Sequence, residues 1–171
     1  MNECKYLRFW CILGFIVSLY ATYVEINLIL NSQYKALCDL APKISCTKAF
    51  ASPYGKGFGL LNNIVSDSET SSSVWNPPNG IFGIVYYAVL YATANINHRS
   101  LRILQFICCI LSNMMSIYLA YILYILDDIC VVCLTIYLIN FMCLWEMLRN
   151  EKSLWTRDFP FPKSKSSTKI D

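Results

Sequence analysis

Two pairs of cysteines are the residues of this 171-residue chain whose type and spacing could do chemistry. Cys130 and Cys133 form a C-x-x-C motif at the start of a long apolar stretch, and Cys38 and Cys46 lie in a more polar segment. Sulfurs spaced in this way at a helix start lie about one turn apart on one face, where they can form an easily reduced disulfide. A second pair on a loop could exchange electrons with it. The spacing therefore suggests a thiol–disulfide relay.

The residues around the C-x-x-C motif act on the reactivity of its thiols in opposite directions. Asp128 is predicted to cap the following helix, which would put Cys130 in the first turn, where the positive end of the helix dipole stabilises a thiolate. The carboxylates of Asp127 and Asp128 act in the opposite direction. Tyr137 lies four residues after Cys133 on the same helix face, where its phenol could hydrogen-bond a carbonyl or quinone oxygen. In a membrane helix, however, a tyrosine more often serves packing.

Other interpretations of the cysteines and polar residues remain open at this point. The four cysteines could form two static disulfides, or a zinc site of four thiolates. Asn79 could cap a helix or contact a ligand. The remaining cysteines are expected to pack as small apolar residues or to be acylated; they are Cys4, Cys11, Cys108, Cys109 and Cys143. No motif for a metal or phosphate site points elsewhere.

The elements that would position these residues are membrane helices. Hydrophobic residues make up 56% of the chain, above the roughly 45–50% of a soluble domain. Four apolar stretches are long enough to cross about 30 Å of hydrocarbon at about 1.5 Å per residue. They run over approximately 9–30, 80–96, 101–126 and 129–148. We therefore expect a single all-α integral membrane domain over residues 1–171, a four-transmembrane-helix bundle.

Basic residues predict how these spans are oriented. Lysines and arginines cluster before the first span, between the second and third, and in the tail over residues 149–171. Because cytosolic segments carry an excess of Lys and Arg, both termini are expected in the cytosol. A long loop over residues 31–79 then lies on the opposite side together with the turn before Cys130, in the lumen of the secretory pathway or a periplasm, where disulfides persist. The net charge of +3 is explained by this tail and indicates no nucleic-acid partner. Within the loop, residues 34–50 are compatible with a short amphipathic helix.

Several segments strongly resemble the vitamin K epoxide reductase family, in order and at near-family spacing from about residue 19 to 145. They are YKALCD at 34–39, ISC at 44–46, FAS at 50–52, GKGFGL at 55–60, NGIFG at 79–83, SIYLA at 116–120 and CVVCLTIY at 130–137. The family includes the reductase and a paralogous "like" form. Tyr54 and Tyr121 stand where other members commonly carry Trp, and the turn before Cys130 is one residue short, which indicates a divergent or invertebrate member.

The resemblance implies a role for each cysteine. Cys130 and Cys133 would be the active-site pair, with Cys133 attacking the bound quinone or epoxide. Cys46 would exchange with Cys130, and Cys38 would accept reducing equivalents from a thioredoxin-like luminal partner. The implied redox-active disulfides are therefore Cys38–Cys46 and Cys130–Cys133, with no tightly bound cofactor and no metal.

The resemblance also implies a substrate site under a capping loop. Asn79 and Tyr137 match positions that hydrogen-bond the substrate oxygens. Phe50, Phe82 and Leu119 match positions lining an apolar pocket, and Ser52 matches a loop residue that steadies the cap.

The implied activity is reduction of vitamin K 2,3-epoxide to the quinone, and of the quinone to the hydroquinone, in the endoplasmic-reticulum membrane. Two rivals remain. One is a disulfide-generating oxidase that passes electrons from secretory proteins to a quinone. The other is a non-enzymatic tetraspan scaffold with structural loop disulfides.

Overall fold

The computed structural model describes residues 3–31, 33–41, 43–59, 77–96 and 98–158, and in these the regular structure is helical. The long helices are α1 (Glu3–Leu30), α4 (Asn79–Thr93), α5 (Arg99–Ile125) and α6 (Val131–Asp158). The loop contributes a short helix α2 (Cys46–Ala51) and two single 3-10 turns, η1 (Pro53–Gly55) and η2 (Gly57–Gly59). Neither α5 nor α6 contains Gly or Pro, so their hydrogen-bond ladders run unbroken.

Three of these helices are long and apolar enough to cross a membrane, by length and composition. The qualifying segments are Lys5–Leu30, Arg99–Ile125 and Val131–Arg149. α4 is equally apolar but has only 15 residues, about 22 Å of helix, because it ends at Thr93 rather than continuing to the expected Ile96. The three longer spans agree with the prediction, whereas a fourth crossing by α4 stays a prediction.

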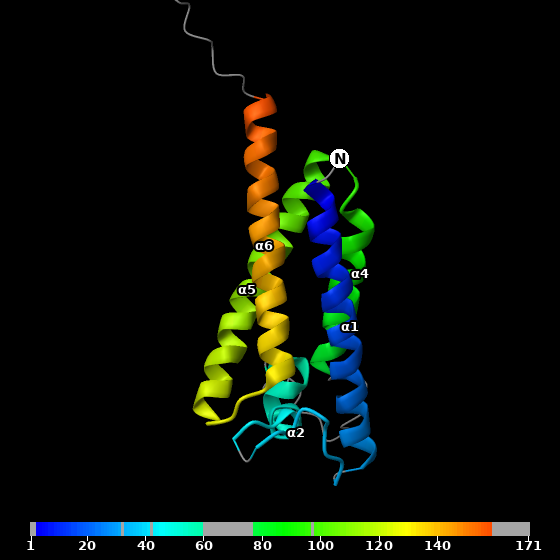
Figure 1. The fold of residues 1–171 in the computed structure, drawn as a ribbon, viewed down its shortest axis with the longest axis vertical. Helices are drawn as coiled ribbons and strands as arrows, with labels where there is room; N and C mark the ends of the chain where they lie inside the picture. Colours follow the sequence, from blue (N-terminus) through cyan, green and yellow to red (C-terminus); the bar gives the residue numbers. More distant parts are fainter. Residues whose placement is uncertain (1–2, 32, 42, 60–76, 97, 159–171) are drawn as a thin grey trace, which may run out of the picture.

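The helices α1, α4, α5 and α6 lie alongside one another (Figure 1). α1 packs against both α4 and α6, and α6 packs against α5. The start of α1 and the far end of α6 lie at the same end of the molecule, and the described part of the loop lies at the other (Figure 1). Large apolar side chains cover the outer faces, as lipid contact requires; on α1 they include Phe9, Ile12, Ile16, Leu19, Tyr23 and Ile26.

The α1–α4 contact is close because it is built from small residues. Gly80 and Gly83 of α4 face Thr22 and Ser18 of α1. A methyl group added at Gly80 would lie 2.8 Å from the Thr22 backbone nitrogen, which cannot move away without shifting the helix. This small-against-small packing is typical of helices associating in lipid.

Two buried clusters stabilise the assembly at different levels. The first lies next to the loop and contains Cys46, Phe50, Cys130 and Val24. The second lies further along the helices and includes Tyr87 and Ile139. Cys11, Cys109 and Cys143 are fully buried in this second cluster, in agreement with the packing interpretation, whereas Cys108 is only partly buried. The side chain of Cys4 lies outside the described residues.

Residues 34–50 are less helical than their sequence suggests. Among the loop residues that the structure describes, only Cys46–Ala51 is α-helical, and the described residues between Tyr34 and Ser45 form turns and isolated bridges. The prediction of an amphipathic helix over 34–50 was therefore wrong for most of its length. Residues 60–76 of the predicted loop and 159–171 of the predicted tail lie outside the described part of the chain.

Candidate active site

A disulfide between Cys38 and Cys46 closes the first turn of the loop, with their Cα atoms 5.8 Å apart. Cys46 is fully buried and Cys38 is partly exposed. The Asp39 carboxylate organises this turn by accepting hydrogen bonds from Ser45 Oγ at 2.9 Å, the Thr47 amide at 3.0 Å, the Ala36 amide at 3.2 Å and the Thr47 hydroxyl. Partial burial raises the pKa of the Asp39 carboxyl, but these hydrogen bonds outweigh it, so the pKa lies below its usual value.

A short backbone ladder fixes the loop against the start of α6. The Ser45 amide donates to the Ile129 carbonyl at 3.0 Å, and the Ile129 amide donates to the Lys43 carbonyl at 2.9 Å. An exposed ion pair between Lys43 and Asp127, at 2.5 Å, lies at the same junction. Cys46 follows Ser45 and Cys130 follows Ile129, so each cysteine comes directly after a residue of this ladder. Both are fully buried in the first cluster.

Cys130, rather than Asp128, caps α6. The helix begins at Val131, and the Cys130 carbonyl accepts from the Leu134 amide at 3.0 Å. The Cys133 amide donates to Cys130 Sγ at 3.2 Å, so the sulfur takes the place of a side-chain cap. The predicted Asp128 cap was wrong, since neither oxygen of that buried carboxylate has a hydrogen-bond partner among the described residues. The start of α6 therefore lies at the C-x-x-C motif itself.

Cys130 and Cys133 are free thiols, while the loop pair is a disulfide. This state differs from two static disulfides. It also differs from a zinc site of four thiolates, because two of the four sulfurs are joined to each other. Among the described residues, no cluster of three or more potential metal ligands is found. One reduced pair and one oxidised pair, with the loop held on the start of α6 by the backbone ladder, are what a thiol–disulfide exchange requires.

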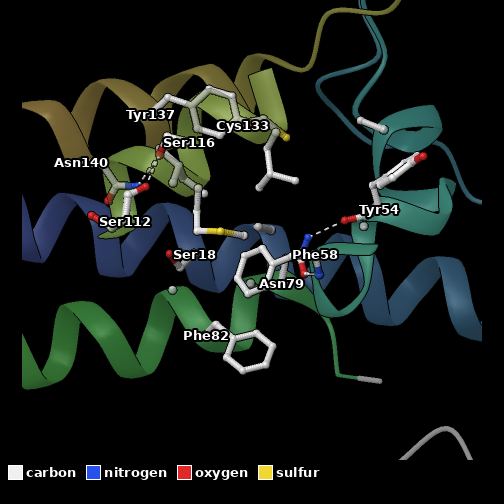
Figure 2. A pocket seen from close by; sticks show the side chains of 18 of the residues that line it. Ser18, Tyr54, Phe58, Asn79, Phe82, Ser112, Ser116, Cys133, Tyr137 and Asn140 are labelled. Atoms are coloured by element: carbon white, nitrogen blue, oxygen red, sulfur yellow. Dashed lines mark hydrogen bonds between the residues drawn. The ribbon is translucent and has the colours of Figure 1, made fainter. Parts of the chain in front are cut away.

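A cavity of about 370 Å³ opens beside Cys133. Of the four candidate redox cysteines, only Cys133 lines it; the candidate substrate-binding residues lining it are Asn79, Tyr137, Phe50, Phe82, Leu119 and Ser52. Cys133 and Tyr137 come from α6, Asn79 and Phe82 from α4, and Tyr54 and Phe58 from the loop (Figure 2). Leu119 comes from α5, so the structure brings the predicted residues from four parts of the chain to one mainly apolar space.

Asn79 ties the loop to the start of α4. Its Oδ1 accepts from the Phe58 amide at 2.9 Å, and its Nδ2 donates to the Tyr54 carbonyl at 2.7 Å (Figure 2). The rings of Phe58 and Phe82 lie 5.2 Å apart, and Phe58 has a positive φ of 57°. Asn79 is the first residue of α4 and does not cap it, because the N-cap position is Pro78. The capping interpretation of Asn79 was therefore wrong.

The deep end of the cavity is polar. The Tyr87 hydroxyl donates to Asn140 Oδ1 at 2.7 Å, and Asn140 Nδ2 donates to Ser116 Oγ at 2.9 Å. Tyr86 and Ser112 hydroxyls lie 3.1 Å apart. This network connects α4, α5 and α6, so it fixes the spacing of these helices beyond Cys133.

Sequence reasoning missed two buried polar residues of α1 at this site. Glu25 is 3% exposed, and its Oε2 accepts from the Gly80 amide at 3.2 Å. Ser18 is fully buried, lines the cavity, and its hydroxyl has no hydrogen-bond partner among the described residues. A carboxylate inside an apolar stretch was a visible signal for Glu25, because such groups are costly in a membrane helix unless they have a partner. A serine gives no comparable signal.

Comparisons with known proteins match this chain to one family. The family model described as "Vitamin K epoxide reductase family" matches residues 6–148. The chain is 37% identical to the vitamin K epoxide reductase complex subunit 1 of Rattus norvegicus over 131 residues. The matched region covers 76% of this chain and 79% of the relative. The same protein of Mus musculus is similar to the same extent.

Proposed function

The chain belongs to the vitamin K epoxide reductase family, and from this premise we propose that it reduces vitamin K 2,3-epoxide and vitamin K quinone at the cavity beside Cys133. The observation that carries the proposal is the free Cys133 thiol in an apolar cavity, with the Cys130 thiol one turn away and Cys46 of the loop disulfide buried in the same cluster as Cys130. A thiol pair is the electron donor that each two-electron reduction needs.

The Cys130–Cys133 pair supplies both electrons. The Cys133 thiolate attacks the epoxide carbon, the carbon–oxygen bond opens, and the oxygen takes up a proton. Cys130 then attacks Cys133 Sγ, forming the disulfide and releasing the substrate carbon, which expels the former epoxide oxygen as water. One dithiol and one epoxide thus yield one disulfide, one quinone and one water. The quinone takes up two electrons and two protons in the same way to give the hydroquinone.

The loop pair then returns the electrons. Reduced Cys46 attacks Cys130 of the active-site disulfide, and Cys38 attacks Cys46 in turn, which restores the loop disulfide and the two active-site thiols. A thioredoxin-like luminal protein reduces the loop pair by attack at Cys38, the more exposed of the two. The order of these steps follows burial, since Cys46 and Cys130 are both inaccessible to a protein partner.

Substrate binding uses the groups that line the cavity. The Tyr137 hydroxyl and one amide hydrogen of Asn79 donate to the substrate oxygens. Asn79 is able to do so while it holds the loop, because its side-chain nitrogen carries two hydrogens and Tyr54 uses one. Phe50, Phe82 and Leu119 contact the apolar ring system. The Ser52 hydroxyl donates to the Ala49 carbonyl at 2.7 Å, which steadies the turn above the cavity.

The proposed setting is the endoplasmic-reticulum membrane, with α4 as a fourth crossing and both termini in the cytosol. The luminal loop then meets an oxidising compartment and a dithiol partner, while the outer helix faces meet lipid. This orientation is supported by the arrangement of the helices, since the start of α1 and the far end of α6 both lie opposite the loop (Figure 1).

The test is turnover of vitamin K epoxide by microsomes containing this chain, with dithiothreitol as reductant. Cys133→Ala and Cys130→Ala are expected to lose essentially all quinone formation, because no other described cysteine except Cys108 lines the cavity. Cys108→Ala is the matched control and should keep its rate within about twofold. If Cys133→Ala still forms quinone, the assignment is wrong. If the intact, inserted chain forms none, the oxidase direction is tested next with reduced protein and quinone.

A further inference from the structure

Tyr20 of α1 directs its hydroxyl at one of the loop sulfurs. The O–H donates to Cys38 Sγ with an oxygen–sulfur distance of 3.8 Å. Tyr20 lies well before the end of α1 at Leu30, and it reaches Cys38 because the loop folds back against the helix, where Tyr34 packs on the same cluster. The contact thus joins a membrane helix to the cysteine at which the partner is proposed to react.

The charges around Cys38 disfavour a thiolate at this sulfur, so a hydrogen-bond donor would stabilise it. Asp39 follows Cys38 in the chain, and its negative charge disfavours a second anion at the neighbouring sulfur. Lys35 is exposed, so water screens its charge. Three other titratable groups lie close to this turn. Tyr23 belongs to α1, Tyr34 belongs to the loop, and Lys43 pairs with Asp127. The Tyr20 hydroxyl is the donor aimed at the sulfur itself.

We propose that Tyr20 is a catalytic residue of the relay, whose hydroxyl donates to the Cys38 thiolate each time the loop disulfide is opened. The inference rests on the proposed function, because it requires Cys38 to turn over. A partner thiolate attacks Cys38 Sγ, the Cys38–Cys46 bond breaks, and Cys46 leaves as a thiolate. The partner's second thiolate then attacks the partner sulfur of the mixed disulfide. Cys38 leaves as the thiolate that Tyr20 stabilises, and the partner ends as a disulfide.

The same hydrogen bond serves the return step. A disulfide sulfur is a weak acceptor, whereas hydrogen bonds to an ionised group are shorter and roughly twice as strong. The 3.8 Å contact is therefore expected to shorten when Cys38 is reduced. A larger thiolate fraction at Cys38 speeds its attack on Cys46 in the Cys46–Cys130 mixed disulfide, which releases the Cys130 thiolate for the next turnover.

The experiment measures the ionisation of Cys38 directly. The full chain is reduced in lipid nanodiscs, pulsed with iodoacetamide across pH 6 to about 10, and the modification of the Cys38 peptide is quantified by mass spectrometry. Tyr20→Phe keeps the ring and removes only the hydroxyl. Its alkylation midpoint is expected to rise by about one pH unit, the scale of one hydrogen bond to a charged group.

Tyr23→Phe is the matched control, since Tyr23 lies on the same helix and is largely exposed. It is expected to keep the wild-type midpoint. Equal midpoints for Tyr20→Phe and the wild type would overturn the proposal and leave Tyr20 as a packing residue. An equal rise in both variants would also overturn it, because the effect would then belong to α1 in general. No vitamin K chemistry enters this assay, so its failure is distinguishable from failure of the reductase proposal.

Discussion

Asp39 shows how a single side chain can hold a redox turn in shape. Its two carboxylate oxygens accept from Ser45, Thr47 and Ala36, so the residues on both sides of the disulfide are tied to one centre. These donors favour the ionised carboxylate. Opening the disulfide removes the covalent link between Cys38 and Cys46, and the Asp39 hydrogen bonds are what then keeps the two thiols close.

Asp39→Asn is predicted to loosen the turn without unfolding the helices. The amide nitrogen of Asn cannot accept from Ala36 or Thr47, so at least one of these hydrogen bonds is lost, at a cost of about 1–2 kcal/mol. Hydrogen exchange at the Thr47 amide should rise in the variant and stay unchanged for amides of α5. If exchange at Thr47 matches the wild type in the reduced protein, the disulfide and not Asp39 holds the turn.

The same residue predicts a pH dependence in the wild type. Hydrogen bonding lowers the folded-state pKa of Asp39, so its stabilisation is fully present above the unfolded value of about 4 and is lost as pH falls through the folded value. Acidification below about pH 4 should therefore raise Thr47 exchange in the wild type and leave it unchanged in Asp39→Asn.

At the scale of elements, the start of α4 is stabilised by a side chain from another helix. Pro78 provides no side-chain cap, and Glu25 of α1 accepts from the Gly80 amide instead. Asn79, at the same helix start, holds the loop through Tyr54 and Phe58. The start of α4 and the described loop residues are therefore held by two side chains close together, Glu25 on the Gly80 amide and Asn79 on the loop.

Glu25→Leu is predicted to open the cavity mouth, because it removes the acceptor for Gly80 and loses a cap interaction of about 1 kcal/mol. Alkylation of reduced Cys133 should speed up several-fold, and the KM for vitamin K epoxide should rise more than kcat falls. Glu25→Gln keeps a carbonyl acceptor of the same reach and should restore both values. Loss of function in Glu25→Gln as large as in Glu25→Leu would contradict the capping role and point to the charge.

Close packing of α1 on α4 gives a separate prediction. Gly80→Ala places a methyl group against the Thr22 backbone nitrogen, which the helix cannot relieve by a side-chain rotation. We expect a destabilisation of about 1–3 kcal/mol, read as a lower thermal midpoint in nanodiscs. Val85→Ala, on an exposed face of the same helix, is the control and should change the midpoint little. An unchanged midpoint for Gly80→Ala would show that the two helices separate readily.

The long helices were predictable because apolar length alone specifies them. The C-x-x-C motif also indicated where α6 begins. The loop was not predictable, since its turns depend on contacts that join distant residues, such as Ser45 with Ile129. The Asp128 cap failed for a similar reason: the chain enters α6 through the loop ladder, which leaves Cys130 at the cap position. Neither contact can be predicted from the residues that are neighbours in the sequence.

At the scale of the whole molecule, the loop and α6 form a single path for electrons in the proposed mechanism. The loop supplies a partly exposed sulfur, then a buried one; α6 supplies a buried sulfur, then one open to the cavity. Each transfer is between neighbours in this order, so the luminal partner and the membrane-bound quinone never have to meet. The backbone ladder at Ile129 joins the two halves.

This arrangement predicts which mixed disulfide forms when the outer sulfurs are removed. In Cys38→Ser/Cys133→Ser, mild oxidation should join Cys46 to Cys130, because the ladder at Ile129 holds the loop on the start of α6 and both cysteines are buried in the same cluster. In Cys38→Ser/Cys130→Ser, the remaining Cys46 and Cys133 should join more slowly by at least about tenfold, since Cys133 lies a turn further along α6. Mass spectrometry of the oxidised peptides measures both yields. Equal rates would mean that the loop moves freely over α6, and the ladder would then have no part in directing the relay.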